Sequence, residues 1–233
     1  MTAPGVEVER REATQWLRLE RPPRNLLDPD VMGALVDELR RCDADASIAA
    51  VVLTGSGDTF CGGLDLAQIQ AGADPAAFGA ALTALLRLLP TLGKPVLAAV
   101  NGDAFASGFA LVCAADYAVT VPEAKLGTPE ASAGTWPMIA QVPLLHRLLP
   151  RHALETVLSG VPFDAQDALR VGAVNRVVDR AELERTILDY ARLASRAGAA
   201  LAPGRRSFYR LLDMSYDEAL VEALDHFAAL FRG

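Results

Sequence analysis

Hydrophobic and polar positions alternate at the start of the chain and then change to helical spacing. Residues 6–20 alternate between apolar and polar side chains, which predicts a β-strand over Val6–Glu20. Asp28 and Pro29 have the residue types of an N-cap and a first-turn proline. Four apolar residues then follow at helical spacing: Met32, Leu35, Val36 and Leu39. We therefore expect a helix over Val31–Cys42.

Short apolar runs and helical segments alternate further along the chain. Three of the runs are typical of buried strands: Ala49–Thr54, Pro95–Val100 and Tyr117–Val121. Helices are expected near Leu64, from Asp74 through Leu89, and after the turn that follows Val100. Leu126 and Gly127 are expected to be extended, and the pattern beyond them is mainly helical. This alternation predicts an α/β architecture.

Two segments share one local plan of strand, glycine-containing turn and first helical turn. They are VVLTGSGDTFCGGLDL (51–66) and VLAAVNGDAFASGFAL (96–111). The unpaired N–H groups at a helix start attract negative charge, and small side chains let a ligand approach the backbone. Each segment alone is more often a plain strand-to-helix turn. Together, two helix starts at one point would hold an oxyanion.

Composition and charge exclude some partners. The chain has 233 residues, is 52% hydrophobic and carries a net charge of −7, so one or two domains with a substantial core are expected. No basic stripe with interleaved aromatics is present, so we expect no nucleic-acid partner. An anionic small ligand remains compatible with this charge, because it needs only a few well-placed arginines.

Cysteine usage and hydropathy indicate a cytoplasmic protein. Cys42, Cys61 and Cys113 are scattered and form no C-x-x-C motif, which favours a reducing compartment. The N-terminal residues lack the apolar core of a secretory signal, and Pro95–Val100 is too short to span a bilayer. The three histidines show no metal-ligand spacing, so we expect no metal. Because no apolar run is long enough to span a bilayer, we also expect no membrane partner.

Four segments in chain order resemble the crotonase superfamily, the enoyl-CoA hydratase/isomerase family. They are Phe60–Leu66 (FCGGLDL), Lys94–Leu111, Leu126–Glu130 (LGTPE) and Phe163–Val178, and the resemblance runs from about Trp16 to Val178. It implies an α/β spiral of ββα units with a C-terminal helical tail. It also implies a homotrimer or homohexamer that binds acyl-CoA thioesters, with coenzyme A as part of the substrate and no other cofactor.

The resemblance assigns roles to residues of the two glycine-containing loops. By position in the motifs, the backbone N–H groups of Leu64 and Ser107 would stabilise a thioester enolate, with Gly63 and Gly108 beside them. The family usually has glycine where this chain has Ser107. Hydratases of the family use two glutamates. Here the first of those positions holds Ala110, and only the second, Glu130, is a carboxylate.

A single carboxylate favours proton transfer over addition of water. Glu130 would remove a proton from the α carbon and return it at the γ carbon, as in a Δ3,Δ2-enoyl-CoA isomerase. The alternatives are a hydratase or lyase acting on a specialised acyl-CoA, and a non-catalytic acyl-CoA binder. From local sequence alone, Thr128, Pro129 and Glu130 also fit a helix N-terminus. The nearby Asp65, Asp103 and Asp116 are weak substitutes for the missing glutamate.

Substrate binding and the tail complete the predictions. Arg24 is a candidate for the phosphates of coenzyme A, as are Arg205 and Arg206, although each could equally be a solvated surface arginine. Trp136 would shape an apolar acyl pocket, with ordinary packing as the alternative. We assign residues 1–195 to the core and 196–233 to a helical segment at an oligomer interface. Ser215 and Glu218 predict a capping box, followed by an apolar stripe that would pack either between subunits or on its own core: Leu220, Leu224, Phe227, Leu230 and Phe231.

Overall fold

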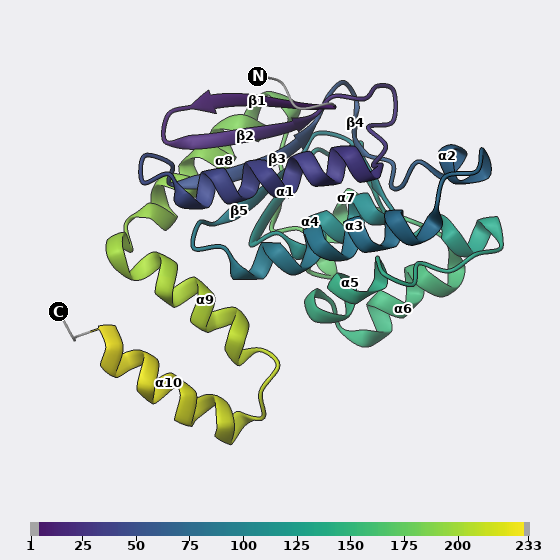
Figure 1. The fold of residues 1–233 in the computed structure, drawn as a ribbon. Helices are drawn as coiled ribbons and strands as arrows, with labels where there is room; N and C mark the ends of the chain where they lie inside the picture. The colour runs from purple at the N-terminus through teal and green to yellow at the C-terminus, as the bar shows by residue number, and fades with distance from the viewer. Residues whose placement is uncertain (1–4, 231–233) are drawn as a thin grey trace.

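Two β-sheets form the centre of the protein, and helices cover them (Figure 1). The computed structural model describes residues 5–230. The larger sheet has the strand order β1 (Val6–Arg11), β2 (Thr14–Leu19), β3 (Ala50–Gly55), β5 (Val96–Val100), β7 (Tyr117–Thr120) and β10 (Arg176–Val177). The smaller sheet has the order β4 (Thr59–Cys61), β6 (Asp103–Phe105), β8 (Lys125–Gly127) and β9 (Phe163–Asp164).

The chain repeats a strand–strand–helix unit. In each unit the first strand joins the larger sheet and the second joins the smaller one: β3 and β4, then β5 and β6, then β7 and β8. The helices that follow these pairs include α2 (Leu66–Gln70) and α3 (Pro75–Leu88), then α4 (Ser107–Ala114), then α5 (Gln141–Arg147) and α6 (Pro150–Ser159). The predicted α/β spiral of ββα units is therefore confirmed.

The first predicted strand is a hairpin instead of one strand. β1 pairs with β2 in antiparallel register, from Val6 opposite Leu19 to Arg11 opposite Thr14. The chain reverses at Glu12, which has φ = 53°. The expectation of one strand over Val6–Glu20 was wrong because alternation is the same in both arms, and no glycine, proline or asparagine marks the turn.

The predicted helix starts are confirmed in their local chemistry. In α1 (Pro29–Ala44) the Asp28 side chain accepts a hydrogen bond from the Val31 amide at 2.9 Å. In α3 the Asp74 carboxylate accepts from the Ala76 amide, again at 2.9 Å. The apolar faces of α1 and α3 pack on each other, and α1 also contacts β1, β2 and β3 (Figure 1). Strands β3 and β5 are buried on both faces, which explains why their sequences are continuous apolar runs.

The C-terminal helices extend away from the sheets (Figure 1). After α7 (Ala165–Arg170) and α8 (Arg180–Ser195), α9 (Leu201–Leu211) reaches the core, and α10 (Tyr216–Leu230) packs on α9. The capping box is confirmed, since Ser215 Oγ donates to Glu218 at 2.6 Å. Four residues of the predicted apolar stripe are at least half exposed: Leu220, Leu224, Phe227 and Leu230. Phe231 lies outside the described residues.

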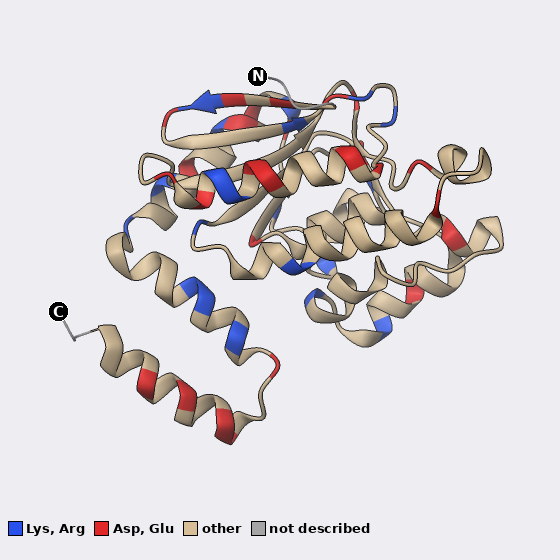
Figure 2. Ribbon diagram, in the orientation of Figure 1, with Lys and Arg blue, Asp and Glu red and all other residues tan. Residues whose placement is uncertain are grey.

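Charge divides between the two tail helices. Figure 2 shows basic residues on α9 and acidic residues on α10.

Among residues 5–230, no helix has the length and hydropathy needed to span a bilayer.

Candidate active site

Three loops meet at one edge of the smaller sheet. Strands β4, β6 and β8 are parallel neighbours, with Cys61 opposite Ala104 and Phe105 opposite Gly127. The carboxyl ends of parallel strands lie at the same edge of a sheet, where α/β proteins commonly bind ligands. The loops that leave these ends carry Leu64, Ser107 and Glu130, respectively. The tertiary structure thus brings together the three residues that the sequence proposes for catalysis.

The backbone amides of Leu64 and Ser107 have no acceptor within residues 5–230. Leu27 bridges to the first loop by donating to the Gly63 carbonyl at 2.9 Å and accepting from the Asp65 amide at 2.8 Å. In such a parallel bridge, the N–H of the residue between them faces away from Leu27. Ser107 is the first residue of α4, whose N-cap residue, Ala106, makes no side-chain cap.

Tight backbone contacts position these two amides. Gly63 has φ = 97°, and a Cβ there would lie 2.8 Å from the Ala106 Cβ and 3.6 Å from the Ser107 nitrogen. A Cβ at Gly108 would lie 2.7 Å from the Cys61 Cβ. Ala106 itself has φ = 53°, which is a strained conformation for alanine. Gly63 and Gly108 therefore allow the two loops to touch, as the sequence predicts.

Glu130 carries an enclosed carboxylate. It lies in a 3₁₀ turn, η2 (Pro129–Ala133), and its Oε2 is buried without a hydrogen-bond partner. Burial raises the pKa of this carboxyl, and a hydrogen bond from its own backbone N–H partly offsets the shift. Thr128 occupies the N-cap position but does not cap, because its hydroxyl is directed to Thr156 at 3.4 Å. Thr128, Pro129 and Glu130 therefore do begin a helical turn, as the helix-N-terminus interpretation predicts, but without a side-chain cap.

The acids near the loops do not take the place of the second carboxylate that Ala110 lacks. Ala110 is fully buried. Asp103 accepts from the Lys125 amide at 2.9 Å, and Asp65 accepts from Gln68 at 2.9 Å. Asp116 binds the Val96 amide at 2.6 Å and Arg205 at 2.8 Å. Each of these acids therefore has a structural contact, whereas Glu130 has a buried carboxylate oxygen without a partner among the described residues.

The arginines and the tryptophan proposed for substrate binding differ in their exposure. Arg24 is exposed beside the first loop, where its carbonyl accepts from the Gly62 amide at 2.8 Å. Trp136 is 37% exposed and donates to Gln141 at 3.0 Å, a contact within its own segment. Arg205 and Arg206, the other candidates for phosphate binding, both have acidic partners. Arg205 is buried against Asp116, and Arg206 pairs with Asp43 at 3.2 Å.

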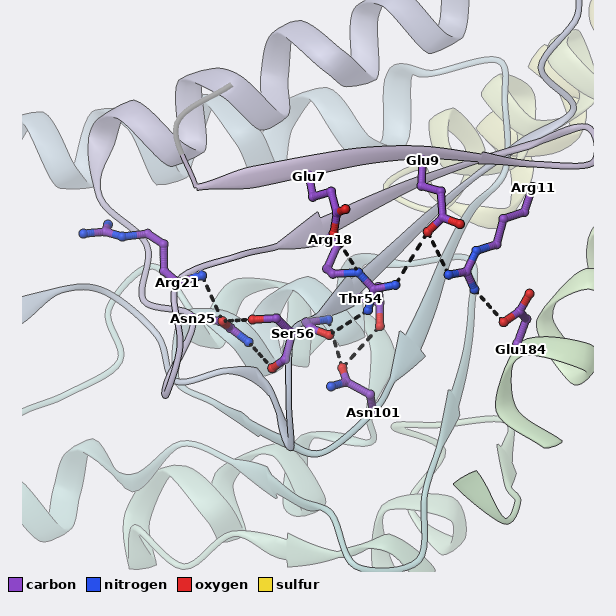
Figure 3. A network of polar contacts seen from close by, with 11 residues as sticks. Glu7, Glu9, Arg11, Arg18, Arg21, Asn25, Thr54, Ser56, Asn101 and Glu184 are labelled. Atoms are coloured by element: carbon purple, nitrogen blue, oxygen red, sulfur yellow. Dashed lines mark hydrogen bonds and ion pairs between the residues drawn. The ribbon is translucent and has the colours of Figure 1, made fainter. Parts of the chain in front are cut away.

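A polar network below the loops was not predicted from the sequence. Asn25 donates to the Thr59 carbonyl at 2.7 Å and accepts from Ser56 Oγ at 3.0 Å. Asn101 accepts from the Gly55 amide at 2.9 Å and donates to the Gly57 carbonyl at 2.8 Å. Figure 3 shows Asn25 directed toward Ser56 and Asn101 directed toward Thr54. The available signal was Asn101 immediately after β5, because an asparagine amide satisfies loop carbonyls and amides together.

Comparison with known protein families gives one extended match. Residues 9–232 match the family model described as enoyl-CoA hydratase/isomerase. The chain is 35% identical to a carnitinyl-CoA dehydratase of Proteus mirabilis over 204 residues, which cover 86% of this chain and 78% of the relative. It is also 35% identical to a carnitinyl-CoA dehydratase of Salmonella typhimurium over 206 residues, covering 87% and 79%.

Solved structures agree with this match. An enoyl-CoA hydratase/isomerase family protein from Silicibacter pomeroyi superposes with a TM-score of 0.91 at 30% identity, covering 97% of this chain and 99% of the other. An enoyl-CoA hydratase from Mycobacterium smegmatis gives a TM-score of 0.91 at 28% identity, covering 98% and 91%. The similarity therefore extends over the core and the helical tail.

Proposed function

The chain belongs to the enoyl-CoA hydratase/isomerase family, and from this premise we propose that it shifts a double bond in an acyl-CoA with one glutamate. The observation that carries the proposal is the unpaired, enclosed carboxylate of Glu130 on a loop beside two amides without acceptors. Ala110 stands where a second catalytic acid would be. This set of groups supports proton transfer next to a thioester.

The proposed reaction moves a proton from the α carbon to the γ carbon of the same substrate, with Glu130 as its carrier. The Glu130 carboxylate takes a proton from the α carbon of a 3-enoyl-CoA. The electrons of that C–H bond form a carbon–carbon double bond, and the carbonyl electrons move to the thioester oxygen. The amides of Leu64 and Ser107 stabilise this enolate oxygen. The enolate then collapses, the double bond moves to the α,β position, and the γ carbon takes the proton back from Glu130.

The magnitudes are sufficient without a second acid. One oxyanion donor is worth about 2.7–4 kcal/mol, and a positioned general base contributes about 10²–10⁴-fold. Burial also raises the pKa of Glu130 toward neutral pH, and a general base is most effective when its pKa lies near the working pH. Coenzyme A enters as part of the substrate, so the proposed step requires no other cofactor. Arg24 is a candidate for its phosphates and Trp136 for the acyl group.

A dehydratase is the second candidate, favoured by the 35% identity to carnitinyl-CoA dehydratases. Removing a β-hydroxyl requires an acid to protonate the departing oxygen as well as a base at the α carbon. Ala110 offers no proton, so Glu130 would have to perform both steps. The isomerase reaction needs only the transfers that one carboxylate can make, which is why we place it first.

The two candidates differ in their substrates. We expect the protein to convert 3-enoyl-CoA to the conjugated 2-enoyl-CoA, measured as a gain in ultraviolet absorbance of the conjugated thioester. With 2-enoyl-CoA the same absorbance should stay constant, because no water is added. Turnover of carnitinyl-CoA or hydration of 2-enoyl-CoA, without reaction of 3-enoyl-CoA, would replace the isomerase proposal with the dehydratase one.

The tail supports an oligomer. Leu220, Leu224 and Leu230 of α10 are at least half exposed, and an apolar cavity of about 680 Å³ lies between α3, α5 and α9. Arg87, Arg147 and Asp213 are the Asp, Glu, Lys and Arg residues of the cavity lining, whereas those of α10 are all acidic (Figure 2). We propose that the segment 196–233 joins subunits of a homotrimer or homohexamer, and that this enzyme works in the cytoplasm with its three cysteines free.

A double substitution tests this assembly. Leu220→Glu with Leu224→Glu places two charges in the apolar face of α10, so we expect the oligomer to dissociate, measured by light scattering coupled to size-exclusion chromatography. Asp225→Asn on the same helix is the matched control and should leave the mass unchanged. A monomeric wild-type protein, or a double variant with wild-type mass, would contradict the proposed interface.

A further inference from the structure

Ser107 differs from the other buried hydroxyl residues of this protein. Ser107 is only 3% exposed, yet its hydroxyl has no hydrogen-bond partner within residues 5–230. Buried hydroxyls normally have partners. The remaining buried serine and threonine residues follow this rule: Thr14, Thr54, Ser56, Thr120, Thr128 and Thr156.

The unpaired hydroxyl is accessible from outside the protein. The fully enclosed side-chain atoms without partners, among the described residues, are Glu130 Oε2 and His152 Nδ1. The Ser107 oxygen is not among them, so the small exposed part of this residue includes its hydroxyl. Ser107 and Glu130 also follow neighbouring strands, and the Ala106 amide donates to the Gly127 carbonyl at 2.9 Å. Two unpaired polar side chains therefore belong to adjacent loops.

We propose that the Ser107 hydroxyl is a third donor to the enolate oxygen, beside the amides of Leu64 and Ser107. This inference rests on the proposed function, because it assigns a further catalytic group to the same site. A serine hydroxyl rotates to suit its acceptor, and the N–H and O–H of one residue can reach a single oxygen. An anion at this helix start would complete the hydrogen bonding of both groups.

The proposal gives the serine a function that glycine could not have. Glycine would supply the same N–H with more backbone freedom, whereas serine adds a donor whose oxygen forms no bond within the protein. The position one turn before Ala110 also places this hydroxyl on the helix face where the second acid is absent. The hydroxyl can donate a hydrogen bond to the negative enolate oxygen, which an ionised carboxylate cannot do.

Acetoacetyl-CoA provides a test that does not depend on turnover. Its bound enolate has a characteristic ultraviolet absorbance, so the fraction ionised at each pH measures how well the site stabilises the oxygen charge. We expect Ser107→Ala, which keeps the amide, to lower the enolate-to-keto ratio about 10- to 100-fold, at or below the lower limit of the roughly 10²–10³-fold range found for loss of one oxyanion donor. Ser107→Gly should show the same loss, and Ser107→Thr should restore most of it.

Stability measurements separate this role from a structural one. Because the Ser107 hydroxyl makes no hydrogen bond within residues 5–230, Ser107→Ala should keep the wild-type melting temperature. Thr14→Val is the matched control. It removes a buried hydroxyl that donates to the Arg11 carbonyl at 2.6 Å, so it should lower the melting temperature and leave the enolate ratio unchanged.

The outcomes distinguish this inference from the function on which it rests. An unchanged enolate ratio in Ser107→Ala, or a higher ratio in Ser107→Gly than in wild type, would overturn the third donor. If wild type stabilises the enolate and fails to convert 3-enoyl-CoA, the isomerase proposal fails while the hydroxyl can still be judged. The same decrease in kcat for 3-enoyl-CoA in the alanine variant would support the proposal.

Discussion

Glu130→Gln is expected to lower kcat for 3-enoyl-CoA by about 10²–10⁴-fold, the usual contribution of a positioned general base. The amide side chain has nearly the same shape as the carboxyl but cannot accept the α proton. Binding of the thioester to the amides of Leu64 and Ser107 does not require this carboxylate, so KM should change little. Steady-state kinetics on the wild type and on Glu130→Gln measures kcat and KM.

Asp103→Asn is the matched control for the loss of one acid near the loops. Asp103 bonds to the Lys125 amide, and we give it no part in proton transfer, so kcat should remain close to that of wild type. Comparable activity in Glu130→Gln and wild type would remove Glu130 from the mechanism. A loss only in Asp103→Asn would move the base to the other loop.

The pH dependence follows from the burial of Glu130. Because burial raises the pKa of this carboxyl above 4.5, the active carboxylate form should be lost at a higher pH than for an exposed glutamate as the solution is acidified. The folded state also favours the protonated form, so ionisation of Glu130 lowers the free energy of unfolding as the pH rises through the folded-state pKa. Glu130→Gln should therefore melt no lower than wild type at neutral pH.

Arg205→Met is expected to reduce the free energy of unfolding by about 3–5 kcal/mol, the range for breaking a buried ion pair by removing one partner. The Arg205 side chain is 7% exposed and donates to Asp116 at 2.8 Å, to the Leu92 carbonyl at 2.6 Å and to the Leu89 carbonyl at 2.9 Å. Without it, the Asp116 carboxylate keeps its burial and loses its cation. Denaturant unfolding monitored by circular dichroism measures the change.

Arg210→Met is the control for loss of an arginine from the same helix. Arg210 is 62% exposed and pairs with Glu222 at 2.5 Å, so its loss should cost about 0–1 kcal/mol, as for other surface ion pairs. Equal effects of the two substitutions would show that α9 does not depend on the buried pair. The double variant with Asp116→Asn should lose less than the sum of the single changes, because the two residues share one interaction.

Local sequence chemistry was sufficient for several elements. The Asp28 and Asp74 caps, the apolar parallel strands and the Ser215 capping box each depend on residues close in the chain, and each is confirmed. The hairpin over β1 and β2 was missed because its turn carries no characteristic residue. Alternation reports which side chains share a face and does not report where a strand reverses.

Longer-range contacts decided the state of the charged and polar groups. Arg205 resembles a surface arginine in sequence, but it lies 89 positions from the acid that it pairs with. Asn25 and Asn101 similarly hold loop carbonyls that are distant in the chain. Partners of this kind cannot be inferred from spacing along the chain, because the sheet pairing that brings them together is itself a product of the whole fold.

The sequence by itself determined the family, the order of strand and helix units, and the presence of one carboxylate where two would serve a hydratase. The tertiary structure alone placed Leu64, Ser107 and Glu130 after the ends of three parallel strands and, within residues 5–230, left the Leu64 and Ser107 amides and Glu130 Oε2 without partners. The physical reason is that residue identity is a local property, whereas burial and unsatisfied hydrogen bonding depend on which distant segments pack against a group.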